Sequence, residues 1–167
     1  TILTIFMNGC KKQPDCPEPT GYQQYGEPFS NVPDTEDMVM YEVNLRAFSQ
    51  EGNLAGVQQK LDHLASLGVN VIWLMPIQTN GGPLNSPYCI SNFYAVDEEY
   101  GTLEDLRTFV AEAHSRDMAV ILDWVANHTS WDHPWIDSTG WHTTDAQGNI
   151  IHPGGTNWTD VADLNFD

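Results

Sequence analysis

An acid, an amide and an imidazole stand close together in the stretch MAVILDWVANH, residues 118–128. Four apolar residues, 119–122, run without a polar break up to Asp123, and Asn127 and His128 follow shortly after. Carboxylate, amide and imidazole groups hydrogen-bond to neutral polyhydroxyl ligands such as sugars, and carboxylate and amide oxygens also bind a hard cation such as calcium. The stretch therefore predicts a polar site directly behind a buried strand.

The charge balance narrows the kinds of partner that such a site could serve. The chain has 23 acidic residues against 6 Lys plus Arg, which gives a formal net charge of -17. A surface this negative repels nucleic-acid phosphates and anionic lipid headgroups alike. We therefore expect no nucleic-acid partner. A length of 167 residues allows one domain with a tail.

Three segments have the composition of β-strands, namely residues 39–45, 69–76 and 118–124. The runs VIWL and AVIL inside two of them show no alternation of apolar and polar residues. Such continuous runs are typical of parallel strands that are covered on both faces. The pattern predicts a buried parallel sheet.

Two helices are predicted between these strands. Asn53 caps the first, which runs to about Leu67 with Gly68 placed to end it. Thr102 and Asp105 fit a capping box at the start of the second. The order strand, helix, strand, helix, strand predicts right-handed parallel βαβ units, whose ligands bind at the carboxyl ends of the strands.

The loops at those ends are long. Residues 76–101 follow the second strand, and residues 125–167 follow the third without a helical period. Long irregular loops on one face of a fold usually carry function. The second loop holds four tryptophans that would hold it together, although they could instead be platforms for sugars: Trp131, Trp135, Trp141 and Trp158.

The N-terminus resembles a processed secretion signal. Residues 1–10 contain an apolar stub too short to cross a bilayer, followed by Asn8, Gly9 and Cys10, as in the lipobox of a bacterial lipoprotein. The resemblance implies that Cys10 is lipidated and that the protein is a bacterial cell-envelope or cell-surface lipoprotein, touching the membrane only through its lipid; otherwise it is secreted. Alternatively, Cys10 is a partly buried thiol.

Residues 11–37 are rich in Pro and Gly and have no periodic apolar face, which is typical of a linker. The two remaining cysteines are Cys16 and Cys89. They could form a disulfide only if folding brings them together, which the sequence leaves open.

Three motifs together resemble the α-amylase family, glycoside hydrolase family 13. DWVANH at 123–128 resembles the segment that ends the third barrel strand of that family, SPYCISNFYAVDEEYGTLEDL at 86–106 resembles the loop after its second strand, and VADLNFD at 161–167 resembles a motif of its inserted domain B. The resemblance implies an α/β fold: the first three βα units of a (β/α)8 TIM barrel at 38–128 and a truncated domain B insertion after strand 3 at 129–167, which together make an incomplete barrel.

The same resemblance implies roles for particular residues. Tyr88, Asp123 and His128 would bind substrate, with Asp123 organising the site and the other two contacting the sugar at the cleavage subsite. Asn127 and Asp163 would ligate a Ca²⁺ ion, for which two side chains alone are too few. Asn127 and Asp163 could instead merely hydrogen-bond within the loop.

No catalytic carboxylate can be assigned, because the family's nucleophile lies in a Gly-x-Arg-x-Asp segment that this sequence lacks. The resemblance implies a retaining hydrolase of α-1,4-glucans such as starch and maltooligosaccharides, of which this segment alone is expected to be inactive. The alternative is a non-catalytic glycan-binding or structural member of the same fold. An unrelated doubly wound nucleotide-binding protein is disfavoured, because no Gly-rich phosphate loop follows any strand.

Overall fold

The computed structural model of the chain describes residues 25–82 and 86–166. A three-stranded parallel sheet with the order β1-β2-β5 forms its centre, from β1 (Met40–Val43), β2 (Val71–Leu74) and β5 (Ala119–Leu122). Each of the three strands lies inside one of the predicted segments. The parallel sheet and the order of its strands are therefore confirmed.

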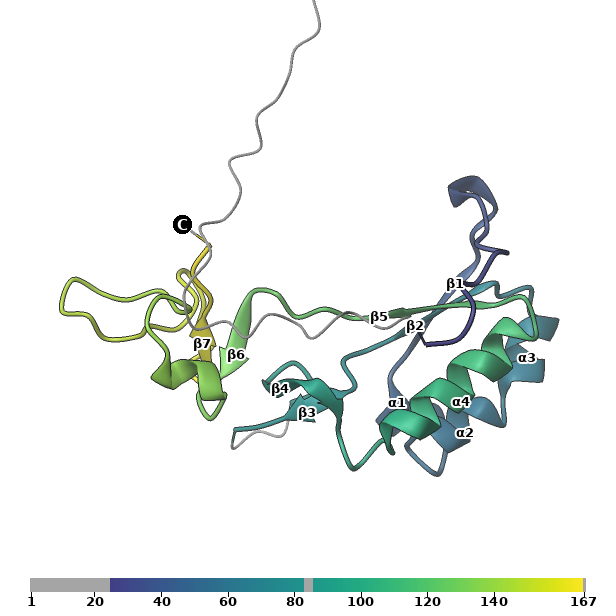
Figure 1. Cartoon of the computed structure of the whole chain (residues 1–167), viewed down its shortest axis with the longest axis horizontal. Coiled ribbons are helices and arrows are strands. Elements are labelled where there is room, and N and C mark those ends of the chain that lie inside the picture. Colours follow the sequence, from purple (N-terminus) through teal and green to yellow (C-terminus); the bar gives the residue numbers. More distant parts are fainter. Residues whose placement is uncertain (1–24, 83–85, 167) are drawn as a thin grey trace, which may run out of the picture.

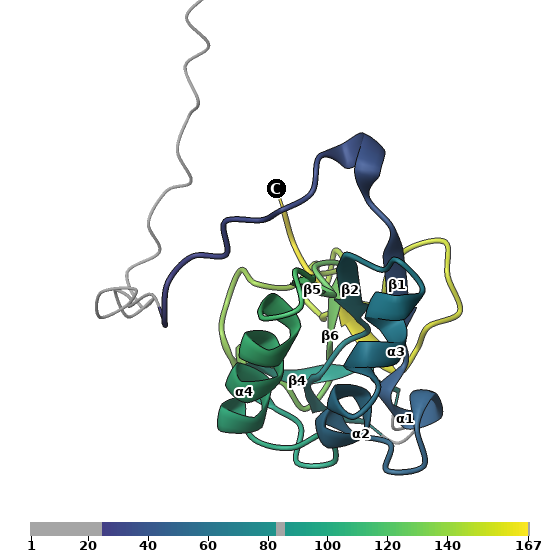
Figure 2. The same cartoon turned by 90° about the vertical axis from the view of Figure 1, so that its right-hand side faces the viewer.

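The helices cover one face of this sheet (Figures 1 and 2). They are the short α1 (Leu45–Phe48), α2 (Leu54–Gln58), α3 (Leu61–Ser66) and the longer α4 (Leu103–His114). The apolar core fills the space between them and the strands, and consists of Val43, Leu45, Leu54, Val57, Leu61, Leu64, Val69, Ile72, Leu74, Ile77, Tyr100, Phe109, Ala113 and Met118.

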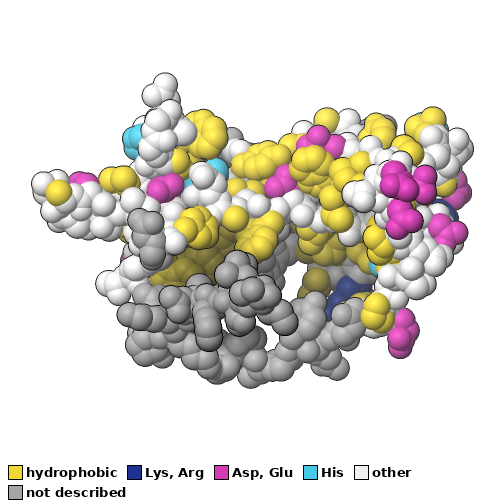
Figure 3. Space-filling view, turned by 90° about the horizontal axis from the view of Figure 1, so that it is seen from above, with side chains coloured by type: hydrophobic (Ala, Val, Ile, Leu, Met, Phe, Trp, Pro, Cys, Tyr) yellow, Lys and Arg dark blue, Asp and Glu magenta, His cyan; other side chains and the backbone are white. Residues whose placement is uncertain are grey.

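The other face of the sheet is not covered by helices, and yellow apolar side chains gather there in the view from above (Figure 3). Met40 and Ile121, which alternate with the core-facing residues Val43 and Val120 of their strands, are both more than a third exposed. The prediction that the continuous apolar runs are covered on both faces therefore holds for VIWL in β2 and is wrong for AVIL in β5. The outer strand β1 is exposed at three of its four residues. Three strands cannot close a barrel, so one face and the β5 edge stay open.

The predicted start of the first helix is confirmed, but its length is not. The Asn53 side chain accepts a hydrogen bond from the backbone N–H of Gly56, as a cap should. The single helix predicted up to Leu67 is wrong, because the backbone of Lys60 leaves helical geometry and divides it into α2 and α3. Gly68 ends α3 with a φ of 80°, which a residue without a Cβ adopts at little cost.

The second helix, α4, matches its prediction. The hydroxyl of Thr102 accepts from the backbone N–H of Asp105, and the Asp105 carboxylate accepts in return from the backbone N–H of Thr102. This capping box sets the first residue of α4 and hence the register with which Phe109 and Ala113 enter the core.

The sequence predicted an irregular loop after β2, but part of this segment has regular structure. It forms an antiparallel hairpin of β3 (Gln78–Asn80) and β4 (Ile90–Val96), with irregular register between them. Asp97 stabilises the hairpin, since its carboxylate accepts from both the backbone and the side-chain nitrogen of Asn80. The hairpin presents the Tyr88 segment next to the sheet.

The segment after β5 also contains regular structure that the sequence did not predict. Strands β6 (His128–Ser130) and β7 (Val161–Asp163) pair antiparallel, and the short 3-10 helix η2 (Pro134–Asp137) lies between them along the chain. Another 3-10 helix, η1 (Thr35–Asp37), precedes β1. In the part of the chain that the structure describes, no helix is long and apolar enough to cross a membrane.

The structure describes one of the three cysteines, Cys89. Cys89 is buried and has a free thiol. Cys10 and Cys16 lie outside the described residues, and so do the lipidation predicted for Cys10 and the pairing of Cys16 with Cys89 that the sequence left open. The domain boundaries proposed from the sequence likewise stay predictions.

Candidate functional site

Asp123 is held where β5 ends. Its backbone N–H donates to the carbonyl of Leu74 at 3.0 Å, which continues the β2-β5 ladder by one residue. Its own carbonyl accepts from the side-chain amide of Gln78 at 3.3 Å. The sheet and β3 therefore fix the backbone of Asp123, and the carboxylate leaves the sheet at its carboxyl end, where ligands bind in parallel α/β folds.

Tyr88 reaches Asp123 from the hairpin loop. The phenol hydroxyl donates to Asp123 Oδ2 at 3.3 Å, although 35 residues separate the two along the chain. Burial raises the pKa of the Tyr88 phenol, and the negative charge of Asp123 raises it further. The hydroxyl thus stays protonated at neutral pH, and it can donate to one group while accepting from another.

His128 joins the same loop through the backbone. Its Nε2 lies 3.1 Å from the carbonyl oxygen of Tyr88, and its Nδ1 lies 3.0 Å from the amide nitrogen of Asn127. The residue is 8% exposed. Burial lowers the pKa of the imidazole, while the Tyr88 carbonyl, Asp160 and Asp163 oppose that shift.

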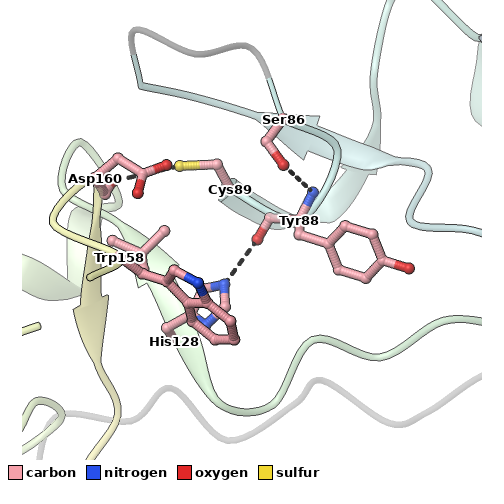
Figure 4. Close-up of a pocket in the computed structure, with 7 residues that line it drawn as sticks. Ser86, Tyr88, Cys89, His128, Trp158 and Asp160 are labelled. Carbon is pink, nitrogen blue, oxygen red and sulfur yellow. Dashed lines mark hydrogen bonds between the residues drawn. The ribbon is translucent and has the colours of Figure 1, made fainter. Parts of the chain in front are cut away.

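The three residues predicted to bind substrate are thus brought together. Tyr88 contacts Asp123 through its hydroxyl and His128 through its carbonyl. They nevertheless present two different surfaces, because the Tyr88 ring points away from the cavity beside His128 (Figure 4). The platform and the imidazole therefore lie on opposite sides of one loop.

The cavity beside His128 has a volume of about 350 Å³. It lies between the hairpin loop and the β6-β7 ribbon (Figure 4) and is lined by Ser86, Tyr88, Cys89, His128, Trp158, Asp160 and Val161. The Trp158 indole meets the His128 ring edge to face at a centroid distance of 5.8 Å. Trp158 is 53% exposed, so one part of its ring is open to a ligand.

Sequence reasoning missed Cys89 and Asp160 as members of this cavity. The Cys89 thiol contacts the carbonyl oxygen of Asp160 at 3.5 Å, and burial raises its pKa. A thiol in that state is a weak nucleophile. No local signal in the sequence marks either residue, because they meet only when the loop before β4 packs against the segment before β7.

Two roles were considered for the tryptophans of the second loop, namely packing within the loop and serving as platforms for sugars. Trp135 and Trp141 stack on each other at 4.5 Å, and Trp135 also packs on Phe93 of β4. These two hold the loop together, as expected. Trp131 and Trp158 are 39% and 53% exposed, so a large part of each ring does not pack within the loop.

Asn127 and Asp163, the predicted calcium ligands, are neighbours across the β6-β7 ribbon. Asp163 stands opposite His128, and the backbone N–H of Leu164 donates to the carbonyl of Asn127 at 3.1 Å. Asn127 is exposed and Asp163 is half-buried. Their oxygens suit a hard cation in type, but calcium needs six to eight. Among the described residues, no group of three or more His, Cys, Asp or Glu is placed to hold a metal ion.

A parallel βα sheet with polar and aromatic side chains at the carboxyl ends of its strands defines the class, which is that of α/β proteins. A family model described as "Alpha amylase, catalytic domain" matches residues 22–152. The chain therefore belongs to the α-amylase family, and its sheet corresponds to the first strands of that family's (β/α)8 barrel.

Individual relatives agree with this assignment. The chain is 31% identical over 162 residues to "Alpha-amylase 3" of Dictyoglomus thermophilum, covering 82% of this chain and 32% of the relative. It is 41% identical over 103 residues to "Trehalose-6-phosphate hydrolase" of Bacillus subtilis, covering 59% of this chain and 18% of the relative.

A solved structure, an alpha-amylase from Lactobacillus plantarum, superposes with a TM-score of 0.72 at 38% identity, covering 78% of this chain and 32% of that one. This chain thus spans about a third or less of the length of the proteins it matches.

Proposed function

We propose that the protein carrying this chain is a retaining glycoside hydrolase of α-1,4-glucans, and that this chain supplies part of its sugar-binding rim. The observation that carries the proposal is the pair of contacts made by Tyr88, one through its hydroxyl to Asp123 and one through its carbonyl to His128. They fix an aromatic ring, a carboxylate and an imidazole at the carboxyl ends of β2 and β5.

Each of these residues has a function that its surroundings support. The half-buried ring of Tyr88 offers a flat apolar surface against which the apolar face of a glucose ring packs. The Asp123 carboxylate accepts a hydrogen bond from the Tyr88 hydroxyl, and this contact fixes the direction of the Tyr88 ring. The ring of His128 borders the adjoining cavity, where a sugar can pack beside it, while its two nitrogens contact Tyr88 and Asn127.

We assign neither catalytic carboxyl role to Asp123. Retaining hydrolysis needs a nucleophilic carboxylate and an acid/base carboxyl roughly 5 to 5.5 Å apart. Asp123 is instead engaged by the Tyr88 hydroxyl, and no second carboxyl group contacts it in any hydrogen bond of the described residues. We propose that the reacting carboxyl groups come from outside this chain.

The cavity favours a neutral glucan over a phosphorylated sugar. Its described lining contains the carboxylate of Asp160 and no Lys or Arg. Phosphate binding in proteins normally uses arginine, lysine or a helix N-terminus, and a nearby carboxylate repels it. An α-1,4-glucan is therefore a better substrate for this rim than the phosphorylated sugar named for the Bacillus subtilis relative.

The experiment is to express the complete reading frame that contains these 167 residues and to follow maltoheptaose hydrolysis by ¹H NMR. The proposal predicts cleavage with release of the α-anomer first, because two displacements at the anomeric carbon retain its configuration. Release of the β-anomer would contradict the retaining mechanism. Glucan binding without cleavage would favour the alternative, a non-catalytic glycan-binding member of the family.

We also propose that Ca²⁺ binds at Asn127 and Asp163, with further oxygens from backbone carbonyls. The support is the hard-oxygen character of both side chains and their position on one ribbon. A saturating ligand that binds only the folded state stabilises it, by about 2.7 kcal/mol at 100 times its Kd. Calcium should raise the Tm of the chain, and Asp163→Asn should abolish that rise. An equal Tm in calcium and in chelator would contradict the site.

We further propose that lipidation of Cys10 attaches the protein to a bacterial cell envelope. The support is the order of residues 2–10, an apolar stub followed by Asn, Gly and Cys. A lipidated protein partitions into the detergent phase of Triton X-114, and Cys10→Ser should move it to the aqueous phase. Equal partitioning of both proteins would contradict the anchor.

A further inference from the structure

A second hollow in the molecule shares no lining residue with the cavity beside His128. Its volume of about 460 Å³ falls within the range of about 300 to 1,000 Å³ that is usual for ligand pockets. We call it the aromatic groove, because six aromatic residues line it, namely Phe93, Tyr94, Trp124, Trp135, Trp141 and Phe166.

Three of these rings are held in place by one another. Trp135 stacks on Trp141 with a centroid distance of 4.5 Å and an interplanar angle of 19°. Phe93 of β4 lies 5.4 Å from Trp135 on the same measure. All three side chains are half-buried. Packing therefore fixes their positions, while part of each ring stays accessible from the groove.

The other three rings are largely exposed to water. Trp124, Tyr94 and Phe166 are 77%, 84% and 78% exposed. Single exposed aromatic residues are ordinary on protein surfaces, but several around one hollow mark an interaction site. A tight bend presents Trp124 directly after β5, since its carbonyl accepts from the backbone N–H of Ala126 at 2.9 Å.

The groove is uncharged in a chain whose formal net charge is -17. Among the described residues that line it, none is Asp, Glu, Lys, Arg or His. A cation or a phosphate would therefore find no opposite charge there. The polar groups of the lining are instead the amides of Gln78 and Asn165, together with the hydroxyl of Tyr94 and the indole N–H of Trp124.

This combination suits a neutral sugar. The apolar face of a pyranose packs on an aromatic ring, and amide, phenol and indole groups hydrogen-bond to its hydroxyls. An entirely apolar ligand would leave those polar groups without partners once it covered them. The chemistry of the groove thus favours a carbohydrate over a lipid or a charged metabolite.

The groove adjoins the predicted substrate-binding residues without sharing their side chains. Gln78 lines it, and the same amide donates to the backbone carbonyl of Asp123 at 3.3 Å. Trp124 is the residue after Asp123, whose carboxylate accepts from the Tyr88 hydroxyl. A sugar in the groove would therefore lie next to the rim that Tyr88 and Asp123 form.

We propose that the aromatic groove is a second sugar-binding site, which holds a neutral α-glucan on the rings of Trp124 and Tyr94. That the sugar is an α-glucan rests on the proposed function. That it is a neutral sugar follows from the lining of the groove itself. Because no carboxyl group lines it, the groove adds affinity for the polymer and takes no part in cleaving its bonds.

Native electrophoresis in gels with and without amylopectin tests the proposal on the protein made from the complete reading frame, because glucan binding slows migration. The variants are made in a Tyr88→Ala background, which removes the platform of the rim. This background protein should still be retarded by amylopectin. Adding Trp124→Leu should weaken the remaining binding by about five- to thirtyfold, as for the loss of a main aromatic contact.

Two further variants separate a sugar platform from a merely apolar surface. Trp124→Tyr keeps a flat ring with a polar tip and should restore most of the retardation, whereas leucine is apolar but not flat. Leu103→Ala is the control, because it shortens another exposed apolar side chain, 51% exposed, on α4 outside the groove. It should leave the retardation of the background protein unchanged. Equal thermal unfolding temperatures show that these variants are folded.

The outcomes separate this proposal from the proposed function. If Tyr88→Ala alone abolishes retardation, or if the unmodified protein is not retarded, the groove binds no glucan and the proposal is overturned. Equal retardation with and without Trp124→Leu also overturns it, and would mean that another part of the protein or a second copy covers the groove. Retardation lost only with Trp124→Leu supports the groove even in a protein that hydrolyses no glucan, a result that contradicts the proposed function alone.

Discussion

The Nε2 atom of His128 lies 3.1 Å from the carbonyl oxygen of Tyr88, and this contact joins the loops that follow the second and third strands of the central sheet. His128 begins β6, whereas Tyr88 lies two residues before the start of β4. Because the Tyr88 hydroxyl also donates to Asp123, the two loops and the end of β5 form one connected unit. A substitution at any of these three residues should therefore alter the positions of the other two.

Removing the Tyr88 hydroxyl tests this connection. Tyr88→Phe keeps the ring and loses one hydrogen bond to Asp123, so maltooligosaccharide affinity should fall by about two- to tenfold in calorimetric titrations. Tyr88→Ala also removes the platform and should weaken binding more. Tyr94→Phe is the control, because Tyr94 is 84% exposed. If Tyr88→Phe and Tyr94→Phe bind equally well, the Tyr88–Asp123 contact has no part in sugar binding.

The capping box of α4 should carry a measurable share of stability. Thr102→Ala removes the hydroxyl that accepts from the Asp105 N–H and should lower the free energy of unfolding by about 1 kcal/mol, within the known range for such caps. Urea titration measures this. Thr108→Ala, an exposed position within the same helix, should not lower it. A cap variant as stable as the unmodified chain would contradict this role of Thr102.

The packing of α4 on the sheet depends on Phe109. It is fully buried in the core, so Phe109→Ala should cost about 3 to 5 kcal/mol through lost burial and the cavity left behind. The chain should then be largely unfolded at temperatures where the unmodified chain is folded. Leu103→Ala on the same helix, where Leu103 is 51% exposed, should change stability by only about 0.5 kcal/mol. Equal costs for the two substitutions would mean that α4 packs differently.

The stability of the chain should fall with acidification. Burial lowers the pKa of His133 and of His142 below the ordinary value of 6.5. The unfolded chain then binds more protons than the folded chain below pH 6.5, so the free energy of unfolding is greatest above that pH and declines beneath it. The lowered carboxyl pKa values of Asp105 and Asp145 act only below their ordinary value of 3.8.

Urea titrations at a series of pH values above 4 measure this effect. His133→Gln should flatten the decline, because one buried imidazole no longer titrates, whereas His63→Gln at an exposed position should leave the slope unchanged. A stability that does not vary between pH 7 and pH 5 would contradict the burial of neutral imidazoles.

The sequence predicted the parts of the fold that local patterns determine. Continuous apolar runs located β2 and β5, and capping residues located the starts of both predicted helices at Asn53 and Thr102. The resemblance of three motifs predicted that Tyr88, Asp123 and His128 bind substrate; hydrogen bonds join the three residues, and their part in sugar binding stays a prediction. These features depend on residues close together in the sequence or on motifs with fixed spacing.

The features that the sequence missed depend on pairing between distant segments. The β6-β7 ribbon joins residues more than 30 positions apart, and the strands are only three residues each. Such short segments carry no periodic signal. The cavity residues Cys89, Trp158 and Asp160 come together only when the hairpin loop packs against this ribbon. The direction of the Tyr88 ring, away from the cavity, likewise follows from its contact with Asp123 and not from its neighbours in sequence.

The most direct test of the central claim is an NMR titration of the full chain with maltoheptaose, following the side-chain signals of Tyr88 and His128. If the connected loops form a glucan-binding rim, both signals should shift together and saturate, and Tyr88→Ala should abolish the shift at His128. Saturable shifts confined to residues remote from Tyr88, Asp123 and His128, or no shift at any maltoheptaose concentration, would contradict the claim that these three residues bind sugar.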